Sequence, residues 1–298
     1  MNMDLRVLRY FLTVVQEEGI VAAANALHMT QPTLSRQLKD LEQELGTQLF
    51  VRGNKAQRLV LTDKGQLLRK RAEDLLLLAD KTKQEIQQDD QLLNGTVHIG
   101  GGESQGMRLI AQAVKQLKDK YPLVSFNIFS GNAEDVKERL DKGLLDFGLF
   151  IEPTNLQKYA TLRLPYIDHW GLLVRRDSAL ADMQTLEAKE LLNIPLLVSN
   201  QQTVKHNFQQ WFKLPIEELN IVSTYNLLFN AALMVEEGVG NAVCLDKLAA
   251  VSDNSNLCFI PLVPQLPIHL DLAWRQYQPL SKEAGAFLRE VEALCAEK

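Results

Sequence analysis

The chain changes character near residue 94, and this change constrains its fold more than any other feature of its sequence. Before residue 94, apolar residues recur every three or four positions, which is the spacing of amphipathic helices. After it, short apolar runs alternate with helical segments, which indicates an α/β domain built on a parallel sheet. We therefore expect a mainly helical N-terminal domain followed by a larger α/β domain.

Three helices are expected in the first 45 residues. Segment 4–17 has one apolar face, formed by Leu5, Leu8, Leu12 and Val15. Segment 20–28 is rich in alanine, which lets another helix approach closely. Thr30 is a candidate N-cap for a third helix that ends at Gly46, because threonine accepts backbone N–H groups at a helix start and glycine adopts the left-handed conformation at a helix end. The apolar face of this third helix is formed by Leu34, Leu38, Leu41 and Leu45.

Segment 49–62 reads as two short strands around a polar turn, which is the pattern of a wing. A long helix is expected from Asp63 to about Asp90, and it carries a heptad seam of Leu68, Ala72, Leu75, Ala79, Thr82 and Ile86. Such a seam packs either against the helix's own domain or against a second copy of the chain. We favour a dimerisation helix, because its flanks are too polar for a helix that is buried on all sides.

The remainder of the chain reads as two α/β lobes within one domain. Strands are expected at 96–101, 123–130, 146–151, 170–176, 194–199, 241–245 and 268–274. Helices are expected at 107–121, 133–143, 185–192, 204–212, 227–238 and 281–298.

Segments 20–28 and 31–45 are two helices joined by a tight turn, which is a helix-turn-helix layout, although any helix hairpin could look like this. The start of the second helix carries short polar and basic side chains, Gln31, Thr33, Ser35, Arg36 and Lys39. Arginine pairs with guanine, glutamine with adenine, and a threonine methyl group meets that of thymine. The formal charge of −5 does not argue against DNA, because local charge distribution matters more than the total.

The segment 20–52, IVAAANALHMTQPTLSRQLKDLEQELGTQLFVR, resembles the N-terminal domain of LysR-type transcriptional regulators. The matching positions are Ala23, Ala24, Leu27, Thr30, Gln31, Pro32, Leu34, Ser35, Gln37, Leu38, Leu41, Glu42, Leu45, Gly46, Leu49, Phe50, Arg52, Leu61, Thr62 and Gly65. The resemblance implies an α/β multi-domain chain with three parts: a winged helix-turn-helix domain at 1–62 (helix-turn-helix about 20–39), a linker and dimerisation helix at 63–91, and a two-lobed effector-binding domain at 92–298. Lobe I would take about 92–161 and 266–298, and lobe II about 162–265.

The resemblance also implies a function. It implies a cytoplasmic regulator that binds an interrupted palindrome near a promoter, and homodimers that are often paired into tetramers. By position, Gln31, Thr33, Ser35 and Arg36 would face the major groove. Arg52, on the wing, would reach the minor groove or its phosphates. Phosphate contacts would come from Lys39, Lys55 and Arg58, although the wing is about two residues longer than we expect for the family.

The effector domain of this family resembles type II periplasmic binding proteins, with a ligand cleft between the lobes. In an open α/β sheet, ligands bind beyond the carboxyl ends of strands. Those ends hold Gly102, Glu103, Ser104, Gln105, Ser130, Asn132, Ile151, Ser199, Asn200 and Tyr225. Such residues either contact a small polar molecule or merely cap helices and make turns. Helix ends favour a carboxylate ligand, whereas Glu103 would instead meet an amine. At position 151 relatives often have a small polar residue.

A hydrolase is the second class of function that we consider. Residues 102–106 spell G-x-S-x-G between an expected strand and an expected helix, which is the context of a nucleophile elbow. Asp246 and His269 follow Ser104 in a permissible order for a catalytic triad. This interpretation leaves the first 90 residues unexplained, so we expect no enzyme.

A thiol-based redox sensor is the third class, because some relatives sense oxidants through cysteine pairs. Cys244 lies in an expected strand, and Cys258 in another apolar stretch, which favours inert thiols. The histidines show no zinc-ligand spacing, and the glycines do not spell G-x-G-x-x-G, so we expect neither a metal nor a cofactor. The sequence contains no membrane-spanning run and no signal-peptide pattern, which fits a cytoplasmic protein.

Overall fold

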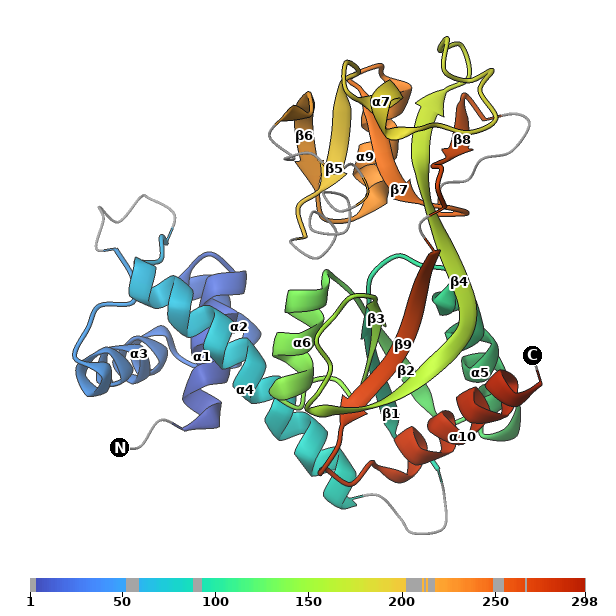
Figure 1. Cartoon of the computed structure of the whole chain (residues 1–298). Helices are drawn as coiled ribbons and strands as arrows, with labels where there is room; N and C mark the ends of the chain where they lie inside the picture. Colours follow the sequence, from blue (N-terminus) through green and yellow to red (C-terminus); the bar gives the residue numbers. More distant parts are fainter. Residues whose placement is uncertain are drawn as a thin grey trace. The chain divides into compact units, whose positions relative to one another are not determined.

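The computed structural model describes residues 4–51, 59–87, 93–201, 211, 213, 218–248, 255–265 and 267–297, without the side chains of residues 84, 85 and 87. The chain divides into two compact units, Met1–Gln87 and Gln88–Lys298, whose elements are labelled in Figure 1. The turn of the predicted wing, with Arg52, Lys55 and Arg58, lies outside the described residues, as does the predicted helix at 204–212 apart from residue 211. Within the described part of the chain, no helix is long and apolar enough to span a lipid bilayer.

Helices dominate the described part of the first unit: α1 (Leu5–Gln16), α2 (Ile20–Ala26), α3 (Gln31–Leu45) and α4 (Asp63–Gln87). The Thr30 hydroxyl accepts the backbone N–H of Thr33 at 3.4 Å at the start of α3. At its end, Gly46 adopts a φ of 64° in the left-handed region. The predicted start and end of the third helix are therefore confirmed. Phe50 and Leu61 form an isolated antiparallel bridge, which is the described part of the predicted wing.

The core of the first unit uses a face of α1 that is shifted from the predicted one but still contains Leu8. Phe11 and Val14 are fully buried beside Leu8, whereas Leu5 is 44% exposed. The ring of Phe11 packs on Phe50 with centroids 5.5 Å apart. The large aromatic side chain takes an inward position, while Leu5, at one end of the predicted apolar face, is largely exposed. Two further residues of the predicted face are only partly buried, Leu12 and Val15.

The long helix α4 packs against its own domain through part of its apolar surface. Ala72 packs against Leu8 of α1, together with Leu76, which the predicted seam does not contain. Leu75 is 39% exposed and Ile86 is 78% exposed within the chain. The first half of α4 therefore stabilises its own domain, because α1 covers it, while apolar side chains further along remain uncovered.

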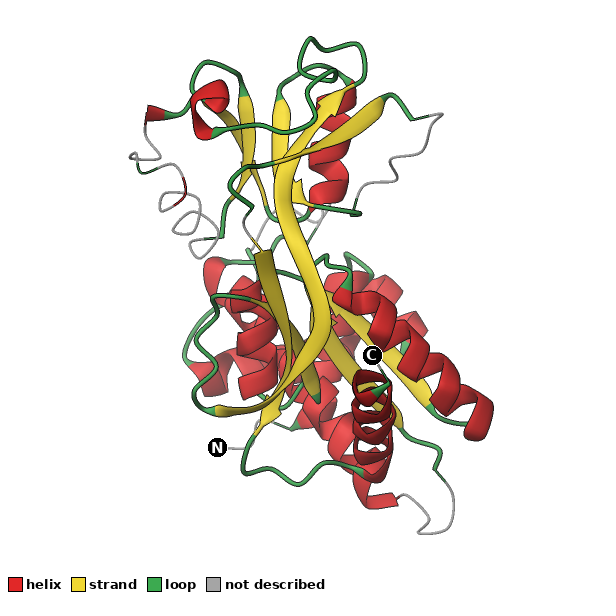
Figure 2. Cartoon of the chain, turned by 45° about the vertical axis from the view of Figure 1, so that its right-hand side comes forward, coloured by secondary structure: helices red, strands yellow, loops and turns green. Residues whose placement is uncertain are grey.

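The second unit contains one mixed sheet between helices (Figure 2). Its strands are β1 (Thr96–Gly101), β2 (Ser125–Ser130), β3 (Phe147–Ile151), β4 (Tyr159–Arg175), β5 (Leu196–Ser199), β6 (Ile221–Tyr225), β7 (Asn241–Leu245), β8 (Leu257–Pro261) and β9 (Pro267–Arg275). Its described helices are α5 (Gly106–Lys120), α6 (Ala133–Asp141), α7 (Ala188–Leu191), α9 (Leu228–Glu236) and α10 (Lys282–Ala296).

The strand order is β2-β1-β3-β9-β4-β7-β5-β6, and β8 pairs with β4. Strands β1, β2 and β3 are parallel to one another, as are β5, β6 and β7. However, β3 pairs with β9, and β9 with β4, in antiparallel fashion, and β4 pairs antiparallel with β7 and β8. The expected parallel pairing therefore holds within each lobe but not for β4, β8 and β9. A chain that crosses to a second lobe and returns needs two connecting strands of opposite direction, and these are β4 and β9.

Each lobe has its own hydrophobic core on either side of this crossing. The first core gathers β1, β3, β9, α5 and α10, with Val97, Ile99, Phe147, Leu270 and Phe287 at its centre. The second gathers β4, β5, β7 and β8, with Leu172, Leu196, Val243 and Ile260 at its centre. The predicted lobe limits near residues 161 and 266 fall on β4 and just before β9, and they stay predictions.

Several elements differ from the expectations. β6, β8 and the first half of β4 were not expected, and α7 has four residues where 185–192 was expected to be helical. In β4 the pairing with β9 shifts register between Arg163 and Ile167. Pro165 lies at this irregularity, where the missing N–H of proline is tolerated. The proline makes the segment read as a loop, although it forms half of the longest strand.

Candidate DNA interface and ligand pocket

The first turns of α3 present a polar surface on the side opposite the core. Leu34, Leu38 and Leu41 are buried against α1 and α2. The predicted DNA-contacting residues on the other side are exposed or, for Ser35, partly buried, and they comprise Gln31, Thr33, Ser35, Arg36 and Lys39. α3 thus anchors itself through its leucines and leaves its polar side chains accessible.

Hydrogen bonds order part of this polar surface. The Gln31 side-chain amide donates to the Ser35 hydroxyl at 3.0 Å, and the hydroxyls of Thr30 and Thr33 are 2.7 Å apart. Arg36 is 83% exposed, and its Nε lies 4.0 Å from the Asp40 carboxylate. An ion pair this exposed is weak, so the guanidinium can exchange it for a base or a phosphate.

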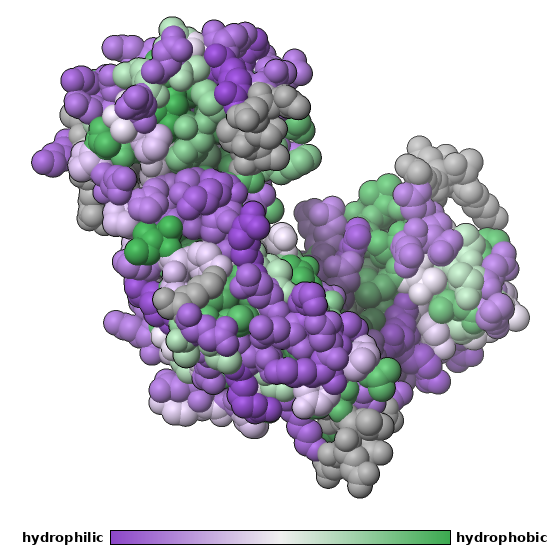
Figure 3. Space-filling model, turned by 90° about the vertical axis from the view of Figure 1, so that its right-hand side faces the viewer, coloured by the Kyte–Doolittle hydropathy of each residue, from purple (hydrophilic) through white to green (hydrophobic). Residues whose placement is uncertain are grey.

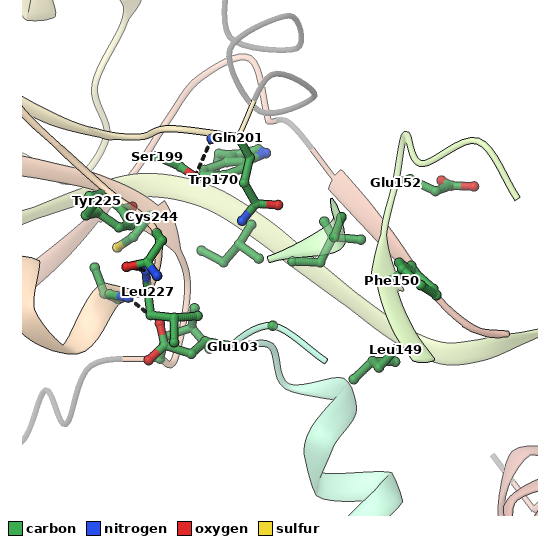
Figure 4. Close-up of a pocket in the computed structure, with 17 residues that line it drawn as sticks. Glu103, Leu149, Phe150, Glu152, Trp170, Ser199, Gln201, Tyr225, Leu227 and Cys244 are labelled. Atoms are coloured by element: carbon green, nitrogen blue, oxygen red, sulfur yellow. Dashed lines mark hydrogen bonds between the residues drawn. The ribbon is translucent and has the colours of Figure 1, made fainter. Parts of the chain in front are cut away.

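A pocket lies where the two lobes of the second unit meet (Figure 4). It holds about 660 Å³, including space that is open to solvent. Five of the ten predicted ligand-site residues line it: Gly102, Glu103, Ile151, Ser199 and Tyr225. The lining comes from both lobes, because β1 and β3 end on one side of it and β5 and β6 end on the other.

The other five predicted residues lie outside the pocket lining and serve the fold. Asn132 caps α6, because its side-chain oxygen accepts the N–H of Asp135 at 2.8 Å. Ser130 is exposed at the end of β2, and Asn200 is exposed after β5. Asn132 thus acts as one of the helix caps that the alternative interpretation expects. Ser104 and Gln105 are buried instead.

Gln105 joins the two lobes. Its backbone N–H donates to the Asp168 carboxylate at 3.1 Å, and its side-chain amide donates to the Lys247 carbonyl at 2.6 Å. Asp168 is fully buried, and burial raises its pKa to about 6. Asp168 therefore titrates in a mildly acidic range, at the point where β4 passes between the lobes.

Glu103 also reaches from one lobe to the other. It follows β1, and its carboxylate accepts the backbone N–H of Leu228, the first residue of α9. Next to it, the Tyr225 hydroxyl donates to the Val243 carbonyl, and burial raises the pKa of this phenol. The Glu103 contact is visible in Figure 4 beside Leu227.

Other lining residues escaped the predicted set. Glu152 and Asn226 directly follow β3 and β6, and Gln201 is the second residue after β5, so the strand-end rule could have found them. Trp170 and Leu245 also line the pocket, and they face each other in the antiparallel β4–β7 pair. No local signal marks the latter two, because their position depends on strand order.

The hydrolase and redox interpretations lack the geometry that they need. Ser104 Oγ is buried and has no hydrogen-bond partner among the described residues, so no base activates it. The Asp246 carboxylate accepts the backbone N–H of His169 instead of orienting a catalytic histidine. Burial raises the pKa of the Cys244 thiol and also that of Cys258, which disfavours the reactive thiolate.

Comparison with known proteins decides the family. Residues 5–66 match the bacterial regulatory helix-turn-helix proteins of the lysR family, and residues 90–296 match the LysR substrate binding domain. The chain belongs to the LysR family of transcriptional regulators. The winged helix-turn-helix, the α/β effector domain and a DNA-binding regulatory function follow from this membership, and the family is one of regulators rather than enzymes.

Individual relatives agree with this assignment. The HTH-type transcriptional regulator BsdA of Bacillus subtilis (strain 168) is 38% identical over 166 residues, which is only 56% of this chain and 56% of BsdA. The uncharacterized regulator YvbU of the same organism is 26% identical over 293 residues, 98% of this chain and 99% of YvbU. The crystal structure of CbnR, a LysR family regulator, superposes with a TM-score of 0.77 at 18% identity, covering 98% of this chain and 99% of CbnR. At that identity the likeness concerns the fold.

Proposed function

We propose that this LysR-family regulator reads an interrupted palindrome near a promoter through the start of α3, and that a small polar molecule in the interlobe pocket modulates its activity. The observation that carries the first part is the polar face of α3, exposed opposite the buried leucines. A structure of CbnR with its target DNA, at a TM-score of 0.75, supports DNA binding by this fold.

Within this proposal, each α3 residue has a role. Gln31, Thr33, Ser35 and Arg36 contact base edges in the major groove, where one well-placed pairing is worth about 1–3 kcal/mol. Lys39 contacts a phosphate and contributes to affinity without selecting a sequence. On the wing, contacts to the minor groove or to phosphates are assigned by family resemblance to Arg52, Lys55 and Arg58.

The pocket supports the second part of the proposal. Its lining comes from both lobes, so a molecule that fits between them binds one lobe arrangement better than another. Coupling of this kind is typically worth about 1–3 kcal/mol and is reciprocal between ligand and DNA.

Self-association is the third part of the proposal. The chain forms a homodimer or a homotetramer in which residues 63–91 make the dimer contact. Exposed apolar side chains on α4 support this, namely Leu67, Leu75, Leu77, Leu78 and Ile86. Apolar side chains are visible among hydrophilic ones on the surface in Figure 3. Contiguous exposed apolar side chains mark interaction surfaces.

In vitro selection of random duplex DNA at one fixed salt concentration tests the DNA-reading role. We expect wild type to enrich a palindrome, and Arg36→Ala to bind it about 5- to 150-fold more weakly, which corresponds to about 1–3 kcal/mol. Arg289→Ala, an exposed arginine of α10, is the matched control and should bind like wild type. An Arg36→Ala variant that binds the selected palindrome as tightly as wild type would contradict the assignment of α3.

A further inference from the structure

The charges around the interlobe pocket are unevenly distributed. Two carboxylates line it, Glu103 and Glu152, and its described lining contains no lysine, arginine or histidine. Arg163 forms an ion pair with Glu152 at the margin of the pocket, and the same guanidinium also pairs with Asp271. The pocket therefore offers negative charge that its own surroundings neutralise only in part.

Lobe II adds no uncommitted cation beside the pocket among the residues that the structure describes. Lys247, which precedes the lining residue Leu248, pairs with the Asp246 carboxylate at 3.2 Å. Asp246 also lies 3.7 Å from His169 Nδ1. The Lys247 ammonium and the His169 ring thus both lie beside the Asp246 carboxylate, so neither is an open partner for an anionic ligand.

The one feature that would attract an anion is already occupied. The N-terminus of α9 lines the pocket with Leu227 and Leu228, and a helix N-terminus favours negative charge. Here the carboxylate of Glu103, from the opposite lobe, accepts the N–H of Leu228. A ligand carboxylate at this place would have to displace Glu103 and would then lie beside it, and like charges at that distance repel.

The remaining lining is mostly apolar, and several of its polar groups are already hydrogen-bonded. Leu149, Leu227 and Leu245 belong to this apolar wall. Ser199 Oγ accepts the N–H of Gln201 at 3.3 Å. In Figure 4, Glu103 lies on one side of the pocket and Glu152 on the other, with apolar side chains between them.

We propose, resting on the ligand-binding role argued above, that the pocket takes a protonated amine on a compact apolar body and excludes carboxylates. The ammonium group lies at Glu103, where it hydrogen-bonds to the carboxylate that caps α9. The apolar body packs against the leucines between the two glutamates. Glu103 is thus the residue that determines ligand class, and it ties the ligand to both lobes at once.

Ligand-observed NMR with matched fragments tests this proposal. The fragments share one apolar body and differ in the head group: cyclohexylmethylamine, cyclohexanecarboxamide and cyclohexanecarboxylate, with further sets of the same design on other bodies. Full-length wild type is compared with Glu103→Gln, and with Glu134→Gln, an exposed glutamate of α6, as the matched control. Gln201→Trp, which fills the pocket from its margin, shows which signals arise there.

We expect ammonium fragments to bind wild type more tightly than their carboxylate partners, and Gln201→Trp to abolish this binding. Glu103→Gln should weaken the ammonium fragments about tenfold, because it removes a charge-assisted hydrogen bond while keeping the side-chain shape. In Glu103→Gln the affinity for the amide fragments should change by less than about threefold. Glu134→Gln should leave the affinity for both classes unchanged. Thermal unfolding of each variant confirms that it folds.

The possible failures are distinguishable. Carboxylate fragments that bind wild type more tightly than the amines, or amine binding that Glu103→Gln leaves unchanged, would overturn the ligand class and leave the pocket as a ligand site. If Gln201→Trp removes the binding of none of the fragments, the pocket is not a ligand site. That result would also contradict the ligand-modulated part of the proposed function.

Discussion

The two functional surfaces of this chain are built in opposite ways. The surface that we propose to face DNA comes from consecutive turns of one helix, α3, in which Leu34, Leu38 and Leu41 are buried and the polar side chains are mostly exposed. The pocket collects single residues from the ends of strands that are far apart in the chain, and hydrogen bonds such as Glu103 to α9 span 125 positions. The first surface depends on local periodicity, whereas the second depends on the order of strands in the sheet.

This comparison can be tested because unfolding of the two units can be followed by different spectroscopic signals. The three tryptophans, Trp170, Trp211 and Trp274, all lie in the second unit. Tryptophan fluorescence during urea denaturation therefore follows the second unit, while circular dichroism at 222 nm follows the helices of both. A change that acts only locally in the first unit should shift one signal and not the other.

The largest expected effect is in the core beneath α3. Leu34→Ala removes a fully buried side chain and should lower the free energy of unfolding of the first unit by about 2–5 kcal/mol. The tryptophan transition should not move. Val21→Ala, at a position that is 64% exposed, is the control and should change stability by less than about 0.5 kcal/mol. An equal shift of the tryptophan transition would show that the units do not unfold independently.

The next effect concerns Asp168 in the second unit. Its pKa is raised by burial from an ordinary 3.8 to about 6, so the folded state binds more protons than the unfolded state between these values. The free energy of unfolding should therefore fall as pH rises from about 4 to about 6 and should be level above that range. Asp168→Asn should remove this pH dependence, which lowers the free energy of unfolding by about 3 kcal/mol across the whole range.

Urea denaturation followed by tryptophan fluorescence from pH 4 to 7.5 measures that slope. Asp182→Asn, at an exposed aspartate, should keep the wild-type profile. A slope that persists unchanged in Asp168→Asn would assign the pH dependence to another group.

A smaller effect is expected at the helix cap that the sequence identifies. Thr30→Ala removes the hydroxyl that accepts the Thr33 N–H, and should destabilise the first unit by about 1 kcal/mol. Thr30→Ser keeps a hydroxyl and should restore most of the loss. Circular dichroism during urea denaturation measures both variants, and a Thr30→Ser variant as unstable as Thr30→Ala would show that the cap is not the cause.

The smallest effect tests a contact between the lobes. Gln105→Ala removes the hydrogen bond to the Lys247 carbonyl and should lower the free energy of unfolding of the second unit by about 0.5–1.5 kcal/mol. Gln112→Ala, on the exposed face of α5, is the control. Tryptophan fluorescence checks the result, and equal stability of Gln105→Ala and wild type would mean that this bond does not hold the lobes together.

The sequence predicts features whose causes are local. Thr30 and Gly46 delimit α3 because a cap and a left-handed glycine act on neighbouring backbone groups. The heptad reading missed Leu76, because its burial depends on which face of α4 meets α1. At the pocket, half of the predicted residues are part of the lining, because several strands end there. Trp170 and the register of β4 could not be predicted, because antiparallel pairing with β7 and β9 is a long-range property.

The most direct test of the account is a thermodynamic cycle between the two surfaces. The affinity for the selected palindrome is measured without ligand and with a saturating ammonium fragment, and the affinity for that fragment is measured with and without the palindrome. We predict that each partner changes the affinity for the other by one common factor of about 5 to 150, which Gln201→Trp abolishes. Affinities that are identical in the presence and absence of the other partner would contradict the claim that the pocket regulates DNA binding.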